Sequence, residues 1–248
     1  MEDGTFKFSN LSKFQGIVHG ISKRNYGQMK FGKGKTEEVI KNREHFFKEL
    51  GIEIKNVAVA NMSHSEKISV IGRQEAGRGS RDQKSAIPMC DGLITAEKEI
   101  SLMITVADCL PILVYDPALN IVSIIHAGWR GILAGIIPNL ISKLKNMGSF
   151  PDDLIVGIGP SICQKHFVVK KDVLEKFKDK YPSATFVRNH DGYVDLKRAA
   201  FEDLIKHNIL KNNIEISHDC PVCNPGIYGS YRLERDKTIF QAAIIGIK

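Results

Sequence analysis

Three β-rich runs lie close together in the middle of the chain and constrain its fold most. They are LMITVADC at 102–109, ILVYDP at 112–117 and IVSIIHAGW at 121–129. Their β-branched residues show little of the apolar and polar alternation of a half-exposed strand, which is typical of strands covered on both faces. Two further runs, LIVGIGP at 154–160 and TIFQAAIIGI at 238–247, indicate additional strands. We therefore expect a buried β core.

Helical patterns flank these strands. Residues 35–50 carry apolar side chains at spacings of three and four, and Gly51 follows as a C-terminal cap. The run at 132–148 has helical periodicity too, but Pro138 should kink or split it, because proline lacks the N–H and clashes with the preceding turn. Helices should therefore cover the outside of the sheet core.

The remaining segments complete one mixed domain. Residues 172–181 and 195–209 predict surface helices, the second with Asp195 as its N-cap. The runs at 57–61 and 68–72 predict a hairpin that places His64 at a strand end or in a turn. Polar, Gly-rich and Arg-rich residues at 73–90 indicate a surface loop. Since no repeat and no linker interrupts the chain, we expect one domain over residues 1–248.

Composition excludes several classes of protein. Of 248 residues, 43% are hydrophobic and 25% charged, the balance of an ordinary soluble globular protein. The longest apolar runs fall far short of the roughly 20 residues that span a bilayer. The N-terminal MEDGTFKFSN lacks the pattern of a secretory signal, and five cysteines, an odd number, suit a reducing compartment. We expect a cytoplasmic protein that does not bind a membrane.

The net charge of +7, from 35 Lys and Arg against 28 Asp and Glu, would favour anionic partners. However, the basic residues are interleaved with acidic ones and form no basic block, which is typical of a solvated surface. We therefore expect no nucleic-acid partner.

Three side chains with metal-binding chemistry fall where expected strands end. Cys109 follows one strand, His126 ends another, and His64 lies near the end of the expected hairpin. Two imidazoles and one thiolate suit zinc, and three protein ligands leave one position open for water. Cys109 and His126 could equally be the nucleophile and base of a Cys-His hydrolase, or a buried thiol and a core histidine.

A second group, His218, Cys220 and Cys223, lies in SHDCPVCNPG. Its spacing is that of a zinc knuckle or a redox pair, although a lone CxxC lacks the second pair of ligands that a structural zinc site needs. Asp219 stands where the zinc deaminase signature has proline. A tight turn before the last strand is the simpler interpretation.

Several motifs together resemble the YfiH family over nearly the whole chain. They are HGISKR at 19–24, DGLIT at 91–95, TVADCLPILVYDP at 105–117, HAGWRGILAGII at 126–137, GIGPSIC at 157–163, DLKRAAF at 195–201 and the closing YGSYRLERDKTIFQAAII. The resemblance implies an α+β fold with mixed β-sheets packed centrally and helices outside. It also implies a zinc-dependent purine nucleoside phosphorylase, acting on adenosine, inosine, guanosine and methylthioadenosine, with adenosine deaminase activity.

When the family's motifs are matched to this sequence, the family's metal ligands correspond to His64, Cys109 and His126. His64 lies in MSHS where the family has QVHG, and Leu233 and Glu234 stand in place of the second arginine of the closing motif. For deamination the metal would generate the nucleophile that attacks purine C6. For phosphorolysis, Arg24 would contact the anion. Asp108, one residue from Cys109, would orient water or donate a proton.

The resemblance leaves other functions open. The altered MSHS motif is compatible with a zinc-binding protein without enzymatic activity, and the family's bacterial members suggest editing of cell-wall precursors. The family's older label, multicopper polyphenol oxidase or laccase, is the weaker alternative, since the chain lacks the several His-x-His pairs that multiple coppers require. The expected partners are purine nucleosides and phosphate.

Overall fold

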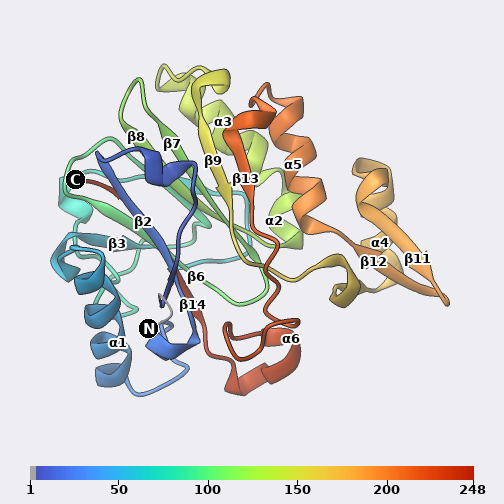
Figure 1. The fold of residues 1–248 in the computed structure, drawn as a ribbon, viewed down its shortest axis with the longest axis horizontal. Coiled ribbons are helices and arrows are strands. Elements are labelled where there is room, and N and C mark those ends of the chain that lie inside the picture. The colour runs from blue at the N-terminus through green and yellow to red at the C-terminus, as the bar shows by residue number, and fades with distance from the viewer. Residues whose placement is uncertain (1–3) are drawn as a thin grey trace.

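The computed structural model describes residues 4–248 and contains two large mixed β-sheets packed between helices (Figure 1). The six-stranded sheet has the order β13-β9-β7-β8-β5-β4, and the five-stranded sheet has the order β1-β2-β14-β6-β3. Bounds of the first sheet are β13 Ile214–Ile216, β9 Ile155–Ile158, β7 Leu110–Asp116, β8 Ile121–Ala127, β5 Gly92–Thr95 and β4 Ile68–Val70. Those of the second are β1 Thr5–Phe6, β2 Ile17–Ser22, β14 Gln241–Ile247, β6 Ser101–Val106 and β3 Val57–Val59.

Alternating side chains show how the layers are stacked. In β7, Leu113 packs with Ile104 of β6 in the core between the two sheets, whereas Ile112 and Val114 pack on the opposite face against helices. In β6, Met103 points the other way, against Phe46. The order of layers is therefore helix, five-stranded sheet, six-stranded sheet, helices. Both sheets are covered on both faces, as the absence of alternation in these runs predicted.

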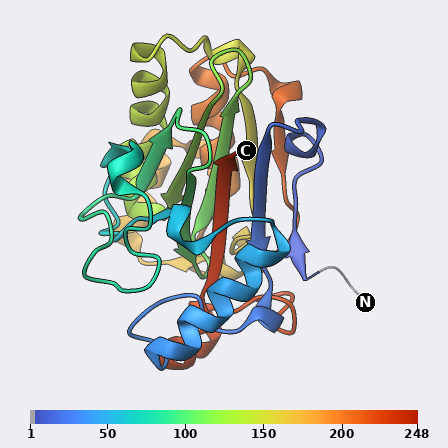
Figure 2. The ribbon, with the colours of Figure 1, turned by 90° about the vertical axis from the view of Figure 1, so that its left-hand side faces the viewer.

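The helices occupy the two outer layers. α1 (Thr36–Glu49) crosses the outer face of the five-stranded sheet, where Figure 2 shows it in front of β14 and β2. α2 (Trp129–Ala134), α3 (Ile136–Asn146) and α5 (Leu196–Lys206) pack on the six-stranded sheet. A small sheet of β10 (Val168–Val169), β12 (Asp191–Val194) and β11 (Thr185–Arg188) extends to one side together with α4 (Lys171–Lys180) (Figure 1). The last α-helix, α6 (Tyr231–Glu234), and a short 3-10 helix at Arg235–Lys237 precede β14.

Most expected elements are present, and the fold is α+β as expected. Asp195 caps α5, because its carboxylate accepts the N–H of Arg198 at 3.0 Å. The helical run after Trp129 is split, but at Gly135, which has a φ of 91°, and not at Pro138. Proline is tolerated in the first turn of α3, where its missing N–H has no partner to lose.

The expected hairpin over 57–72 is wrong. β3 pairs in parallel with β6, and β4 pairs in parallel with β5, so the two strands belong to different sheets. The loop that carries His64 consequently crosses from one sheet to the other. Within residues 4–248, no helix has the length and apolar character needed to cross a membrane.

Candidate functional site

His64, Cys109 and His126 come together at one end of the six-stranded sheet. Cys109 lies in the turn where the chain passes from β6 in one sheet to β7 in the other, and His126 is near the end of the adjacent β8. His64 reaches them from the loop between β3 and β4. Their potential ligand atoms all lie within 4.8 Å of one another. The spatial cluster expected from the sequence is thus formed.

Asp91 organises two of the three side chains. Its buried carboxylate lies 2.9 Å from Nδ1 of His126 and accepts the backbone N–H of His64 at 2.9 Å. It also accepts the N–H groups of Ser63 and Ser65, at 3.0 and 2.8 Å. Burial opposes ionisation of this carboxylate, but the hydrogen bonds from His126 and the loop outweigh burial and hold its pKa well below the usual range. Because Nδ1 of His126 is engaged, Nε2 is the nitrogen available to a ligand.

Sequence reasoning missed Asp91, although the DGLIT motif that begins with it was part of the resemblance. The altered MSHS motif also contacts Asp91. Ser63 and Ser65, which replace the family's residues, donate backbone N–H groups to Asp91, and their hydroxyls donate to the same carboxylate at 3.3 and 3.0 Å. The serines that replace the family's residues therefore still hold in place the loop that carries His64.

The electrostatics favour a thiolate at Cys109. Burial raises the pKa of this thiol, but the imidazoles of His126 and His64 more than offset burial and bring the pKa down to about 6. Burial lowers the pKa of His126, whereas Cys109 and Asp91 raise it to a net value of about 9. The thiolate is the form that binds a metal ion, and metal binding would displace the proton of His126.

The residues present fit a zinc ion. Two imidazoles and a thiolate are its preferred donors, and the carboxylate behind His126 is the usual support for such a ligand. Space for the ion depends on Gly128, since a Cβ there would lie 2.9 Å from Sγ of Cys109 and within 4 Å of both histidine rings. His64 is exposed, so the cluster is open to solvent on its side. Three ligands with one open side is the arrangement of a catalytic metal site.

Asp108, expected to act on water or a proton, has both carboxylate oxygens engaged. One accepts the hydroxyl of Ser230 at 2.8 Å, and the other accepts the N–H of Arg232 at 2.7 Å. Burial raises the pKa of Asp108, although these two hydrogen bonds oppose the rise. In this structure Asp108 holds the start of α6 beside the cluster.

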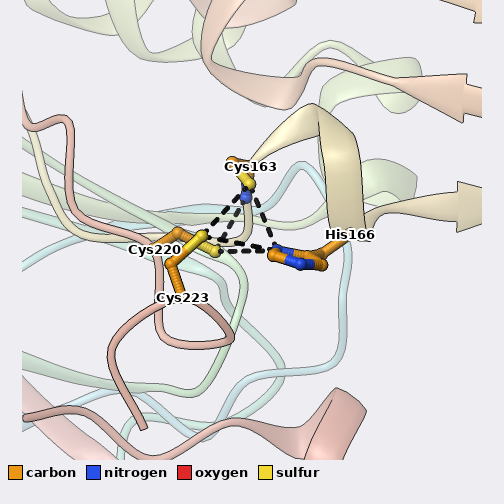
Figure 3. A group of neighbouring side chains, drawn as sticks. All are labelled: Cys163, His166, Cys220 and Cys223. Carbon is orange, nitrogen blue, oxygen red and sulfur yellow. Dashed lines mark hydrogen bonds between the residues drawn. The ribbon is translucent and has the colours of Figure 1, made fainter.

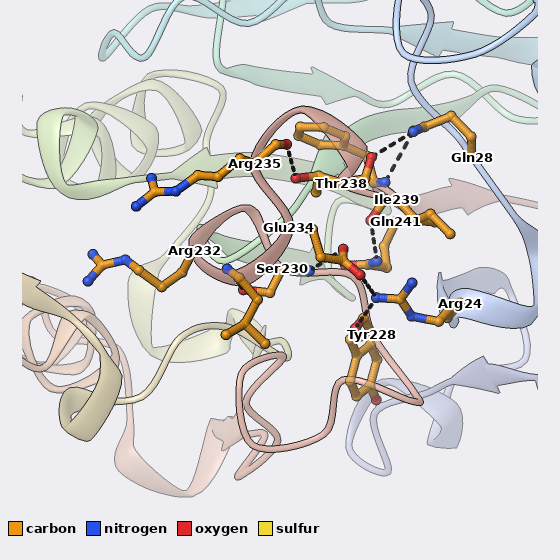
Figure 4. Close-up of polar contacts among 12 residues, drawn as sticks. Arg24, Gln28, Tyr228, Ser230, Arg232, Glu234, Arg235, Thr238, Ile239 and Gln241 are labelled. Atoms are coloured by element: carbon orange, nitrogen blue, oxygen red, sulfur yellow. Dashed lines mark hydrogen bonds and ion pairs between the residues drawn. The ribbon is translucent and has the colours of Figure 1, made fainter.

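Arg24, expected to contact an anion, is ion-paired with Glu234 and donates to the carbonyl of Tyr228 at 3.3 Å (Figure 4). Glu234 is one of the positions at which the closing motif departs from the family. Lys30 is a further cation that the sequence did not single out. Burial and Lys33 lower the pKa of its ammonium, and the charge of Cys109 opposes that shift, so Lys30 lies within electrostatic reach of the cluster.

Other polar residues of the family-like motifs, and the second Cys/His group, lie elsewhere. His19 is buried in β2 and accepts the N–H of Phe8 at 3.0 Å, and Arg130 stacks on Trp129. Cys220 and Cys223 do cluster with other ligands, but with Cys163 and His166, and His218 is not among them.

Comparison with known proteins identifies the family. Residues 14–248 match the family described as multi-copper polyphenol oxidoreductase laccase. The chain is 27% identical to purine nucleoside phosphorylase YlmD of Bacillus subtilis, over 92% of this chain and 85% of YlmD. It is 29% identical to adenosine deaminase RL5, from an unknown prokaryotic organism, over 74% of this chain and 72% of RL5.

Its structure resembles that of the hypothetical protein YfiH of Bacillus licheniformis, with a TM-score of 0.90 and 26% identity over 94% of this chain and 93% of YfiH. A family match that covers nearly all of the chain agrees with the motifs and the shared fold. The chain therefore belongs to the YfiH family, the group described as multi-copper polyphenol oxidoreductase laccase.

Proposed function

We propose that this protein is a zinc-dependent purine nucleoside phosphorylase that also deaminates adenosine. The substrates would be adenosine, inosine, guanosine and methylthioadenosine, with phosphate as the second substrate. The observation that carries the proposal is the cluster of His64, Cys109 and His126, supported from behind by Asp91. The printed names of two relatives, a purine nucleoside phosphorylase and an adenosine deaminase, supply the reaction classes.

His64, Cys109 and His126 would hold the metal. A zinc ion with three protein ligands and an open position acts as a Lewis acid and lowers the pKa of water to about 7, which supplies a nucleophile at neutral pH. Asp91 keeps Nε2 of His126 directed to the site and fixes the loop of His64. Cys109, as a thiolate, contributes the negative charge that favours a divalent cation.

The other residues would serve the substrates. Asp108 orders Ser230 and Arg232 at the start of α6, so that this segment is positioned before substrate binds. Positive charge near the phosphate would come from Lys30 and from Arg24, whose availability depends on its ion pair with Glu234.

A Cys-His hydrolase would use the same thiolate and imidazole, with Cys109 as nucleophile. The third donor, His64, and the space preserved by Gly128 favour a metal instead. Neither feature distinguishes zinc from copper, so the metal itself has to be identified. Two imidazoles and one thiolate could serve a single ion, whereas a multicopper oxidase needs several.

The test is to follow the products formed from adenosine by the purified protein, with and without phosphate. We expect adenine only when phosphate is present, and inosine in both cases. Both products should disappear in His64→Asn and persist in His190→Asn, a control in an exposed turn. Zinc binding without either product would overturn the proposal and favour a zinc protein without enzymatic activity or one that edits another substrate. Oxidation of phenols would favour the copper enzyme.

A further inference from the structure

Four side chains outside the site described above form a second cluster of metal-binding groups. Cys163 follows β9, and His166 ends the short helix at Gln164–His166. Cys220 and Cys223 lie in the loop between β13 and α6. Figure 3 shows the three sulfur atoms and the imidazole pointing toward a common centre, although the two halves of the cluster are 54 to 60 residues apart in sequence.

The distances match those of a tetrahedral zinc site. Nδ1 of His166 lies 3.4, 3.7 and 3.5 Å from Sγ of Cys163, Cys220 and Cys223. Zn–S bonds of about 2.3 Å and Zn–N bonds of about 2.0–2.1 Å at tetrahedral angles require S···N separations of about 3.6 Å and S···S separations of about 3.8 Å. The Cys163 and Cys223 sulfurs are 3.9 Å apart. All of these separations therefore agree with one central ion.

The backbone around the cluster is organised for four ligands. Each half supplies two ligands with two residues between them, Cys163-x-x-His166 and Cys220-x-x-Cys223, a spacing common in structural zinc sites. Within the turns, the N–H of His166 bonds the carbonyl of Cys163 at 3.0 Å, and that of Asn224 bonds the carbonyl of Cys220 at 2.9 Å. The N–H of Cys163 also donates to Sγ of Cys220 at 3.3 Å, as expected when that sulfur is a thiolate.

From this geometry we propose that the protein binds a second zinc ion through Cys163, His166, Cys220 and Cys223, and that this ion is structural. Four protein ligands complete a tetrahedral shell and leave no position for a substrate. A disulfide explains the cluster less well. All three cysteines are free, and the 3.9 Å between the Cys163 and Cys223 sulfurs is far from the roughly 2.05 Å length of a disulfide bond. Nδ1 of His166 also lies within 3.4 to 3.7 Å of every sulfur.

The ion would fasten the loop before α6 to the six-stranded sheet. The guanidinium of Arg232 in α6 donates to the carbonyl of His166 at 3.0 Å, and the backbone N–H of Arg232 donates to the carboxylate of Asp108 at 2.7 Å. On the other side of the cluster, Ile162, next to Cys163, donates its N–H to the carbonyl of Asp108 at 2.9 Å. The second ion would therefore hold in place the segment that contacts Asp108, the neighbour of Cys109. The second ion itself would take no part in the proposed reaction.

The experiment is to measure zinc per chain by elemental analysis and native mass spectrometry on the reduced, full-length protein. We expect two zinc ions in the wild type, one in Cys223→Ser, one in Cys109→Ala and none in the double variant. Cys223 is exposed, so its substitution should not unfold the core. His166→Ala should lose one ion, whereas the neighbouring His218→Ala should keep both.

Cobalt substitution provides a readout that does not depend on activity. The Cys109→Ala protein loaded with Co²⁺ should show intense thiolate-to-metal charge-transfer absorption, and adding Cys223→Ser should greatly weaken it. The proposal is overturned if Cys109→Ala binds no zinc, or if the zinc content of Cys223→Ser equals that of the wild type. Zinc in Cys109→Ala but none in Cys223→Ser would support this site and count against the site at His64, Cys109 and His126. The failure of one proposed site can therefore be distinguished from the failure of the other.

Discussion

The imidazole of His126 and the carboxylate of Asp91 lie side by side in the protein interior, with Nδ1 of the histidine 2.9 Å from Oδ1 of the aspartate. The backbone N–H of His126 also bonds the carbonyl of Asp91, at 2.7 Å. The pair fixes both the position of the ring and the nitrogen that it offers to a metal ion. The cluster of His64, Cys109 and His126 is built on strand ends and loops. The pair of Asp91 and His126 is thus the rigid part of it.

Asp91→Asn should weaken zinc binding at the cluster by about 10- to 100-fold, the usual effect of losing the carboxylate behind a ligating histidine. The change also removes part of the charge that fixes the His64 loop. Affinity would be measured by competition with a chromophoric chelator. Asp116→Asn is the control, because Asp116 is equally buried but caps a distant turn. Equal affinities for the Asp91 variant and the wild type would argue against this role.

Gly128→Ala should reduce zinc binding and nucleoside turnover at least tenfold while the protein remains folded. The added methyl group would lie 2.9 Å from Sγ of Cys109 and displace a ligand, and misplacement by about 1 Å can cost about 10²-fold in rate. Gly16→Ala, where a Cβ meets nothing within 4 Å, should behave as wild type. Circular dichroism would check the fold. If the Gly128→Ala protein is active and binds zinc fully, the metal ion does not need the space beside Gly128.

Asp108→Asn and Ser230→Ala should lower kcat to a similar extent and leave zinc content unchanged. Each change weakens the contacts by which Asp108 holds the start of α6. Ser230→Ala removes the hydroxyl that bonds the carboxylate at 2.8 Å, and Asp108→Asn leaves one acceptor oxygen where the hydroxyl and the N–H of Arg232 need two. Steady-state kinetics with adenosine and phosphate would compare them. A far larger loss in Asp108→Asn than in Ser230→Ala would indicate instead that the carboxylate takes part directly in proton transfer.

Lys30→Met should raise the KM for phosphate by about tenfold, since a hydrogen bond to a charged group contributes about 1.5–3 kcal/mol. Phosphate-independent deamination of adenosine should not change. Lys33→Met is the matched control, because Lys33 is a nearby lysine that faces Asp236. Arg24→Gln should have a smaller effect than Lys30→Met, because Arg24 already pairs with Glu234. The reverse order would assign the phosphate contact to Arg24.

Stability should fall between pH 6.5 and 4 because of His19. Burial and the charge of Lys7 lower the pKa of this histidine from 6.5 to about 4. As pH falls through this window, the unfolded chain takes up a proton that the folded protein does not. The free energy of unfolding should therefore decrease, by about 3 kcal/mol if the whole shift is realised.

Urea unfolding of the wild type and His19→Gln at pH 7 and pH 4.5 would measure this contribution. The side-chain amide introduced by His19→Gln can still accept the N–H of Phe8 but does not titrate, so the variant should lose less stability on acidification. The same loss in both proteins would show that other groups, such as carboxylates, account for the pH dependence.

Much of the architecture could be predicted from local patterns. Two features that nearby residues determine were correctly predicted. They are the buried strands β7 and β8, from runs without apolar and polar alternation, and the helix cap at Asp195. The partition of β3 and β4 between two sheets could not be predicted, because short strands do not encode their distant partners. Gly135 rather than Pro138 splits the helix, since the first turn accommodates proline.

Part of the candidate site could likewise be predicted from local patterns, and part could not. His64, Cys109 and His126 were found because their residue types suggested metal chemistry and the family motifs contain them. Asp91 was missed because a buried carboxylate has no local signal. The cluster of Cys163 and His166 with Cys220 and Cys223 was missed because the two halves lie 54 to 60 residues apart. Distant contacts of this kind emerge only when the chain is folded.

The most direct test of the account is a crystal structure with anomalous diffraction recorded on both sides of the zinc and copper absorption edges. We predict a zinc peak bonded to Sγ of Cys109 at about 2.3 Å and to one nitrogen each of His64 and His126 at about 2.0–2.1 Å. A copper signal there, or no metal peak in protein that turns over adenosine, would contradict the assignment of zinc chemistry to these three residues.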